Sequence, residues 1–195
     1  MIGIRMLALL IGTALVPAAS QAEQTAPAAR RFEWTTKSDQ AKQALLELQE
    51  QIENFQFGAT NLELANKIMT ADPNFAIGMY YLSVVTLGPQ AVELYQKSRE
   101  LAKNASDGER GFIEAMSHVR LNQGVDFAKS IEPLEALARD YPGERLIQVI
   151  LGQLYNGNNQ PEQANAAFLK AQQIGPKTAR VEAFLASIIK PARNS

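Results

Sequence analysis

Cysteine is absent from the 195-residue chain, and histidine occurs only once. The first absence excludes disulfides, thiolate catalysis, thiolate metal ligands and a lipid anchor on an N-terminal cysteine. The second excludes metal sites that need several histidines. A strong charge of either sign is missing too, because 19 basic and 20 acidic residues give a formal net charge of −1. A nucleic-acid partner, which would require a basic surface, is therefore not expected.

The N-terminal segment has the pattern of a secretory signal peptide. One arginine precedes an apolar run over 6–16, which is shorter than the ~20 residues of a membrane-spanning helix. Small residues follow, in the pattern of a cleavage site. We predict that residues 1–22 are removed after Ala22, with cleavage after Ala18 or an uncleaved anchor as alternatives. The mature chain is then expected in the periplasm or outside the cell, with no stable membrane span.

Residues 23–37 lack hydrophobic periodicity and are predicted to form a flexible lead-in. Phe32 and Trp34 interrupt this otherwise polar and small-residue segment. Two roles are open for Trp34, the only tryptophan: it caps the first helix by packing on the domain, or it marks a docking segment. At the other end, residues 191–195 are predicted to form a disordered tail.

From Ser38 onward, apolar residues recur at intervals of three and four, and no segment alternates with period two. This pattern predicts helices and no strands. Short breaks rich in Gly, Pro and Asn delimit nine expected helices. These helices cover 39–55, 60–71, 75–87, 90–103, 107–121, 125–140, 144–156, 161–174 and 178–189. Each is too short to be stable alone and must bury its apolar stripe on a neighbour.

Two kinds of local signal refine the helix boundaries. Thr60, Ser106 and Asn159 each precede a glutamate by three residues, which predicts a capping box at three helix starts. Pro133 falls inside the helix expected over 125–140. A proline there is expected to kink that helix or to delay its start.

A repeat signature lies in the segment 145–178. Its residues are Leu151, Gly152, Tyr155, Ala164, Phe168, Ala171 and Pro176. Their spacing resembles the tetratricopeptide repeat (TPR), a 34-residue helix-turn-helix unit, although Gln148 stands where that family often has tryptophan. Gly152 and Ala164 are expected to face each other where the two helices cross, with Tyr155 and Phe168 filling the space beside them.

The resemblance implies an all-α fold, a right-handed α-solenoid of about four helix-turn-helix repeats. We assign the repeats to 39–73, 74–105, 106–142 and 143–176 within a domain over 38–190. Only the last repeat carries the full signature. The helix at 178–190 is expected to cap the C-terminal end, burying Val181 and exposing Arg180.

No catalytic, phosphate-binding or metal-binding motif occurs, so neither an enzyme nor a bound cofactor or metal is expected. The lone His118 is predicted to be solvated or half-buried. In such repeats the first helix of each pair lines a concave groove, which implies a protein or peptide partner. The expected groove residues are Tyr80, Tyr81, Val84, Phe112, Met116, Arg120, Gln153 and Asn156, with Val149 beside them.

The resemblance also allows one family mechanism to be rejected. Some members hold the C-terminal carboxylates of a partner with Lys and Asn on first helices, but this chain has Tyr80, Val84, Val149 and Gln153 at matching positions. The sequence therefore favours a non-enzymatic envelope scaffold that binds another kind of peptide or helix. A self-associating structural protein, active as a homo-oligomer, and an accessory subunit of an envelope enzyme remain the alternatives.

Overall fold

A computed structural model describes residues 29–121 and 126–189. The expected signal peptide, the first part of the lead-in and the expected tail lie outside these ranges. The described ranges hold α-helices and no strand, which confirms the all-α prediction. The helices are α1 (Asp39–Glu53), α2 (Ala59–Ala71), α3 (Ala76–Val85), α4 (Pro89–Ala102), α5 (Asp107–Ala115), α6 (Ser117–Arg120), α7 (Phe127–Asp140), α8 (Arg145–Gly157), α9 (Pro161–Ile174) and α10 (Ala179–Ile189).

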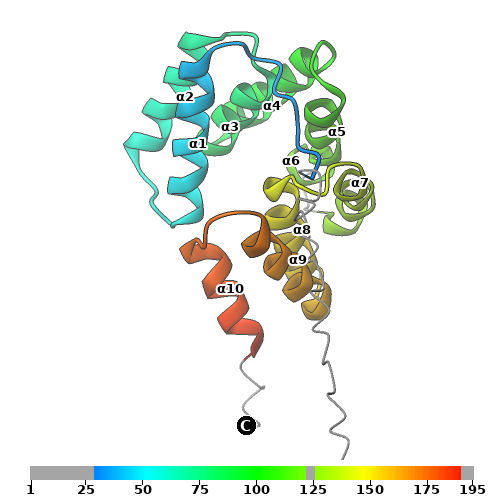
Figure 1. Cartoon of the computed structure of the whole chain (residues 1–195). Helices are drawn as coiled ribbons and strands as arrows, with labels where there is room; N and C mark the ends of the chain where they lie inside the picture. Colours follow the sequence, from blue (N-terminus) through cyan, green and yellow to red (C-terminus); the bar gives the residue numbers. More distant parts are fainter. Residues whose placement is uncertain (1–28, 122–125, 190–195) are drawn as a thin grey trace, which may run out of the picture.

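The helices pack as consecutive antiparallel pairs (Figure 1). The pairs are α1 with α2, α3 with α4, α5 with α7, and α8 with α9. Each pair also contacts the next pair, and α10 packs on α9. This arrangement confirms the predicted solenoid of four helix-turn-helix units with an additional C-terminal helix.

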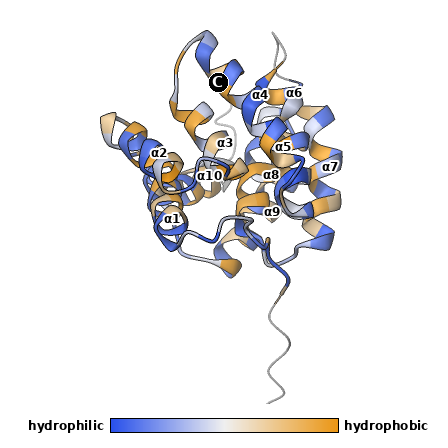
Figure 2. Cartoon of the chain, turned by 90° about the horizontal axis from the view of Figure 1, so that it is seen from above, coloured by the Kyte–Doolittle hydropathy of each residue, from blue (hydrophilic) through white to orange (hydrophobic). Residues whose placement is uncertain are grey.

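The core follows from the spacing of apolar residues on each helix. In α1, Ala41, Ala44, Leu45 and Leu48 recur at intervals of three and four, and all four are buried. That spacing places them on one face of the helix. Figure 2 shows the same division along the other helices, with apolar segments gathered where helices meet. Burial of these stripes, rather than local helix propensity, stabilises the pairs.

The helix expected over 107–121 is interrupted at Met116. This residue has φ −79° and ψ −3°, so α5 ends before it and the short α6 begins after it. The break allows Arg120 of α6 to donate a hydrogen bond to the Ser83 carbonyl oxygen of α3 at 2.6 Å. By contrast, α7 begins six residues before Pro133 and continues through it.

Of the three predicted capping boxes, only one half of one forms: Ser106 caps α5, but the Ser106 N–H donates to the Thr35 hydroxyl and not to Glu109. The Ser106 hydroxyl accepts a hydrogen bond from the Glu109 backbone N–H. The prediction for Thr60 is wrong, because α2 starts earlier and the Asn61 side chain caps the Gly58 N–H at 2.8 Å. Asn159 does not cap α9 either, since it takes a left-handed conformation with φ 57° and Gln160 occupies the N-cap position.

The signature residues of the last repeat lie at the contact of α8 with α9. All except Pro176 are buried. Gly152 faces the ring of Phe168 rather than Ala164, because the three atoms nearest to an added Cβ would all belong to that ring, at 2.5–2.7 Å. The ring in turn stacks on Phe184 of α10, with centroids 4.8 Å apart. The small residue therefore makes room for an aromatic side chain, not for a second small one.

We expect Gly152→Ala to lower the free energy of unfolding by about 1–2 kcal/mol. The added methyl group overlaps a ring that is fully buried and held by Phe184, and this overpacking outweighs the helix propensity of alanine. Gly111→Ala is the matched control, since the nearest atoms to its Cβ would belong to the flexible side chain of the half-buried Leu137, at 2.9 Å or more. Urea unfolding measures both variants. Equal stability of the two would contradict this account of the repeat.

Candidate functional site

An extended N-terminal segment, residues 29–37, crosses the turns that join successive helix pairs (Figure 1). We call it the strap. At its start, the Gly143 N–H donates to the Arg30 carbonyl oxygen at 2.9 Å. The Arg31 guanidinium donates to the Gly143 carbonyl oxygen at 3.0 Å. These bonds attach the strap to the turn before α8.

Phe32 anchors the strap. Its side chain is 8% exposed and lies edge-on to Tyr141, with ring centroids 5.0 Å apart. The ring of Phe112 in α5 also lies beside the Phe32 ring, with centroids 6.3 Å apart. Gly108 makes this approach possible, because a Cβ at that position would lie 2.3 Å from the Phe32 ring. The anchor therefore joins the strap to the third helix pair and to the turn before the fourth.

The second half of the strap contacts the first two turns between pairs. Trp34 packs on Phe75, with centroids 6.2 Å apart. The Thr35 N–H donates to Glu109 at 2.8 Å, and the Thr35 hydroxyl accepts from the Ser106 N–H at 2.9 Å. Residues 29–37 are thus attached to the domain, and the prediction of a flexible lead-in is wrong for them. Single residues such as Phe32, Trp34 and Thr35 attach the segment to the domain. Because these residues do not recur at a regular interval, hydrophobic periodicity could not predict the attachment.

Glu109 lies beneath the strap as a fully buried carboxyl group. One of its oxygens accepts the Thr35 N–H, while the other has no hydrogen-bond partner. Burial raises its pKa above the ordinary value of 4.5, the bond from Thr35 opposes that rise, and the negative charge of Asp72 adds to it. Because the pKa is higher in the folded state, folding takes up protons and stability falls as the pH rises through that pKa.

We expect Glu109→Gln to raise the free energy of unfolding by about 1 kcal/mol at pH 8 and to leave it nearly unchanged at pH 4. The amide keeps an oxygen for the Thr35 N–H and removes the buried negative charge. Unfolding by urea at a series of pH values tests this, with the exposed Glu93→Gln as control. If the free energy of unfolding of Glu109→Gln changes with pH in the same way as that of the wild type, the role given to this carboxyl group is contradicted.

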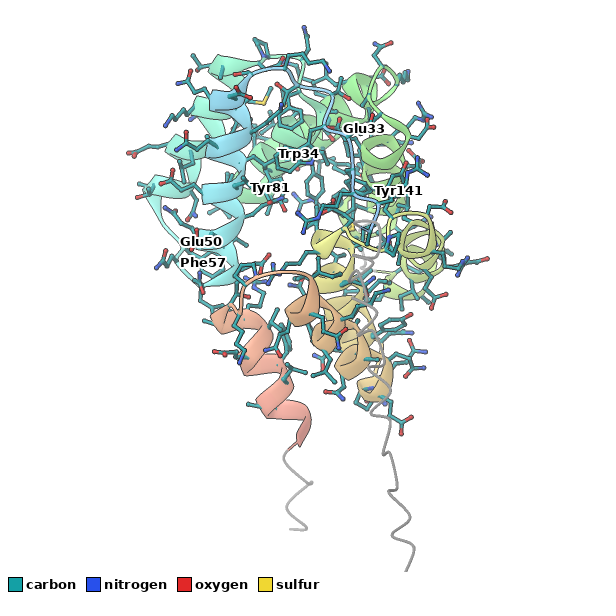
Figure 3. All side chains as sticks on the ribbon, viewed as in Figure 1. Glu33, Trp34, Glu50, Phe57, Tyr81 and Tyr141 are labelled. Carbon is teal, nitrogen blue, oxygen red and sulfur yellow. The ribbon has the colours of Figure 1, made fainter. Side chains whose placement is uncertain are left out.

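A hollow of about 510 Å³ lies between the strap, α1, the start of α8 and the turn before α10. Its lining residues are Arg31, Phe32, Trp34, Leu46, Gln49, Glu50, Glu53, Glu144, Arg145, Leu146, Gly175, Pro176 and Thr178. The residues from α1 are spaced by three, four and seven, so they form a second face of that helix beside its buried stripe. Figure 3 shows Trp34 on the strap and the side chains of α1 that surround this region.

The floor of the hollow is a buried ion pair. Arg145 contacts both carboxylate oxygens of Glu53, at 2.6 and 2.5 Å, and the two side chains are only 15% and 11% exposed. The Thr178 hydroxyl donates to Glu53 at 3.0 Å, and Arg145 donates to the Pro176 carbonyl oxygen at 3.1 Å. The pair thus connects the first, fourth and last parts of the array.

The same region joins α10 to α1. Arg180 donates to the Ile52 carbonyl oxygen at 2.9 Å, and the Ala179 N–H donates to the Asn54 side chain at 3.0 Å. The guanidinium also lies over the ring of Phe55, 5.0 Å from its centroid. Arg180 therefore does not point outward as the sequence predicted. The two ends of the array therefore meet at one border of the hollow, which stays partly open to solvent.

Half of the predicted groove residues are buried in the core and do not line this hollow. Tyr80, Tyr81, Phe112 and Met116 are at most 6% exposed, so they belong to the core and not to an open surface. Gln49 of α1 donates to the Tyr81 hydroxyl at 3.0 Å, which shows that α1 covers this part of α3. Val149, expected beside the groove, is buried as well. The other predicted groove residues are more accessible, since Val84, Arg120 and Gln153 are half-buried and Asn156 is exposed.

Sequence reasoning missed most of the hollow. Glu53 and Arg145 are 92 residues apart, and no motif links them. One pattern in the sequence could have indicated part of the hollow. Leu46, Glu50 and Glu53 recur at helical spacing on a second face of α1, beside the apolar stripe.

Other features of the described ranges do not suggest a different site. A second hollow of about 520 Å³ lies between α7, α8 and α9. His118 is half-buried in α6. Within 29–121 and 126–189, no three His, Cys, Asp or Glu side chains gather so as to hold a metal ion. Every helix of the described chain is too short or too polar to span a lipid bilayer.

No known protein family matches the chain, and no curated protein matches it. Among solved structures, the chain is similar to MamA 41-end from Desulfovibrio magneticus RS-1, with 18% identity and a TM-score of 0.40. It is also similar to the MamA RS-1 ArsTM double mutant, with 19% identity and the same TM-score. Each alignment covers 78% of this chain and 85% of the other.

Proposed function

We propose that this chain is a non-enzymatic protein-interaction scaffold of the bacterial cell envelope, and that it receives a segment of a partner protein in the hollow beneath the strap. The observation that carries the proposal is the hollow itself. Its wall combines an aromatic ring, exposed aliphatic side chains and charged groups, which is the mixture that binds peptide segments. Helix-pair arrays commonly use such inner surfaces for binding.

Site-specific photo-crosslinking tests the proposal. Leu46 is 57% exposed and lines the hollow, so a photoreactive phenylalanine at this position should crosslink to the partner in intact cells. The matched control is Leu87, which is 90% exposed in the turn between α3 and α4 and does not line the hollow. Crosslinks that form equally well from both positions, or only from Leu87, would contradict binding in the hollow.

Self-association is the second candidate, and one observation favours it. Phe55 and Phe57 are 48% and 66% exposed in the turn between α1 and α2. Two large exposed aromatic side chains in one turn are suited to contact with a second copy. Light scattering coupled to size exclusion distinguishes the two functions, because a scaffold that waits for a foreign partner should be a monomer.

The location in the envelope rests on the signal-peptide pattern of residues 1–22, which lie outside the described ranges. Export removes this segment, so the mature chain should begin at Glu23. N-terminal sequencing of protein from a periplasmic or culture-medium fraction tests this. An intact Met1 in a cytoplasmic fraction would contradict it.

A further inference from the structure

The charged groups that line the hollow do not balance. Three carboxylates and two guanidiniums line it. Arg145 is bound to Glu53, and the charge of Arg31 acts on Glu144. Glu50 remains, and no hydrogen bond or ion pair joins its exposed carboxylate to another described residue. Glu50 is therefore the charged lining residue whose side chain has no partner in the described ranges.

The groups around Glu50 suit a cation on an aliphatic stem. Trp34 lines the same hollow and is half-buried, so part of its ring is accessible to a cation. Leu46, one turn before Glu50 on α1, is an exposed apolar side chain against which a methylene chain can pack. The same groups do not suit an anionic ligand. Both guanidiniums already donate to oxygens of the chain, and Glu50 would repel it.

We propose that the hollow selects partner segments that present a lysine or arginine, with the cation beside Glu50 and the stem against Leu46 and Trp34. This inference rests on the proposed function, because it names the chemistry of the segment that the hollow receives. It differs from the groove expected from the sequence, which has no acidic member. The recognising residues come from α1 and the strap, not from α3 and α5.

Titration with four synthetic peptides tests the inference. The peptides share one background of leucine and serine and differ only in a central Lys, Arg, Gln or Glu. Trp34 is the only tryptophan of the chain, so its fluorescence reports occupation of the hollow directly. We expect the Lys and Arg peptides to bind about tenfold more tightly than the Glu peptide, as one charged contact would give.

The variant Glu50→Gln should abolish this preference, whereas Glu47→Gln should retain it. Glu47 is a matched control, because it is an exposed acid of the same helix that does not line the hollow. A preference for basic peptides that survives in Glu50→Gln would overturn the inference. Binding of all four peptides with equal affinity would also overturn it, yet would leave the proposed function standing. If no basic peptide binds, the inference fails as well, and crosslinking from Leu46 then decides separately whether the hollow binds a partner.

Discussion

Arg145→Ala is expected to lower the free energy of unfolding by about 3–5 kcal/mol. The substitution leaves the Glu53 carboxylate buried, with only the Thr178 hydroxyl as a hydrogen-bond donor. Breaking a buried ion pair by removing one partner is costly because the other charge remains without compensation. The contact of α10 with α1 should weaken at the same time, since Arg145 also holds the turn before α10 through Pro176.

Two further variants separate this effect from a general loss of charge. Arg99→Ala removes an ion pair with Glu114 that is made by three hydrogen bonds but is 37% and 61% exposed. Its loss should cost less than about 1 kcal/mol, because solvent screens exposed pairs. The double variant Glu53→Leu with Arg145→Met should recover much of the lost stability. Equal losses for Arg145→Ala and Arg99→Ala in urea unfolding would refute the role given to the buried pair.

Phe32→Ala should destabilise the protein by about 3 kcal/mol and release the strap. The side chain is buried between Tyr141 and Phe112 and rests on Gly108, so its removal leaves a cavity that these aromatic rings do not readily fill. The released strap would expose Trp34, whose emission should shift to longer wavelength. Fluorescence during urea unfolding measures both effects in one experiment.

Glu33→Ala provides the control, because Glu33 is an exposed residue of the strap (Figure 3) and should change neither quantity. Gly108→Ala tests the same contact from the other side, since the added Cβ would occupy the place of the Phe32 ring. We expect it to reproduce the shift of Trp34 emission. If Phe32→Ala keeps wild-type stability and emission, the strap is not an integral part of the fold.

The helix pairs could be predicted from the sequence because each depends on a local pattern. The stripe of α1 and the cap at Ser106 are determined by residues within a few positions of each other. The two incorrect cap predictions show that a local sequence pattern alone does not determine where a helix begins. At Thr60 and Asn159 the capping pattern is present, but Asn61 binds the Gly58 N–H at the start of α2, and Gln160 occupies the N-cap position of α9 without a capping bond.

The strap and the hollow could not be predicted because they depend on contacts between distant segments. Phe32 owes its burial to Gly108 and Tyr141, and nothing in residues 29–37 encodes that pocket. Four of the expected groove residues, Tyr80, Tyr81, Phe112 and Met116, are buried for the same reason. The periodicity of α3 places Tyr81 on an inner face, but only the full fold shows that Gln49 of α1 covers it.

The proposed binding site requires the array to close, with α10 in contact with α1 at the border of the hollow. Because the chain has no cysteine, spin labels can be attached at two introduced cysteines, Gln56→Cys and Glu182→Cys, both at exposed positions near this contact. Their separation can then be measured by electron–electron double resonance. A single short distance with a narrow distribution is expected, and Arg145→Ala should broaden and lengthen it. A long and broad distribution in the chain with native Arg145 would show that the array is open, which would contradict the hollow described between its ends and the function proposed for it.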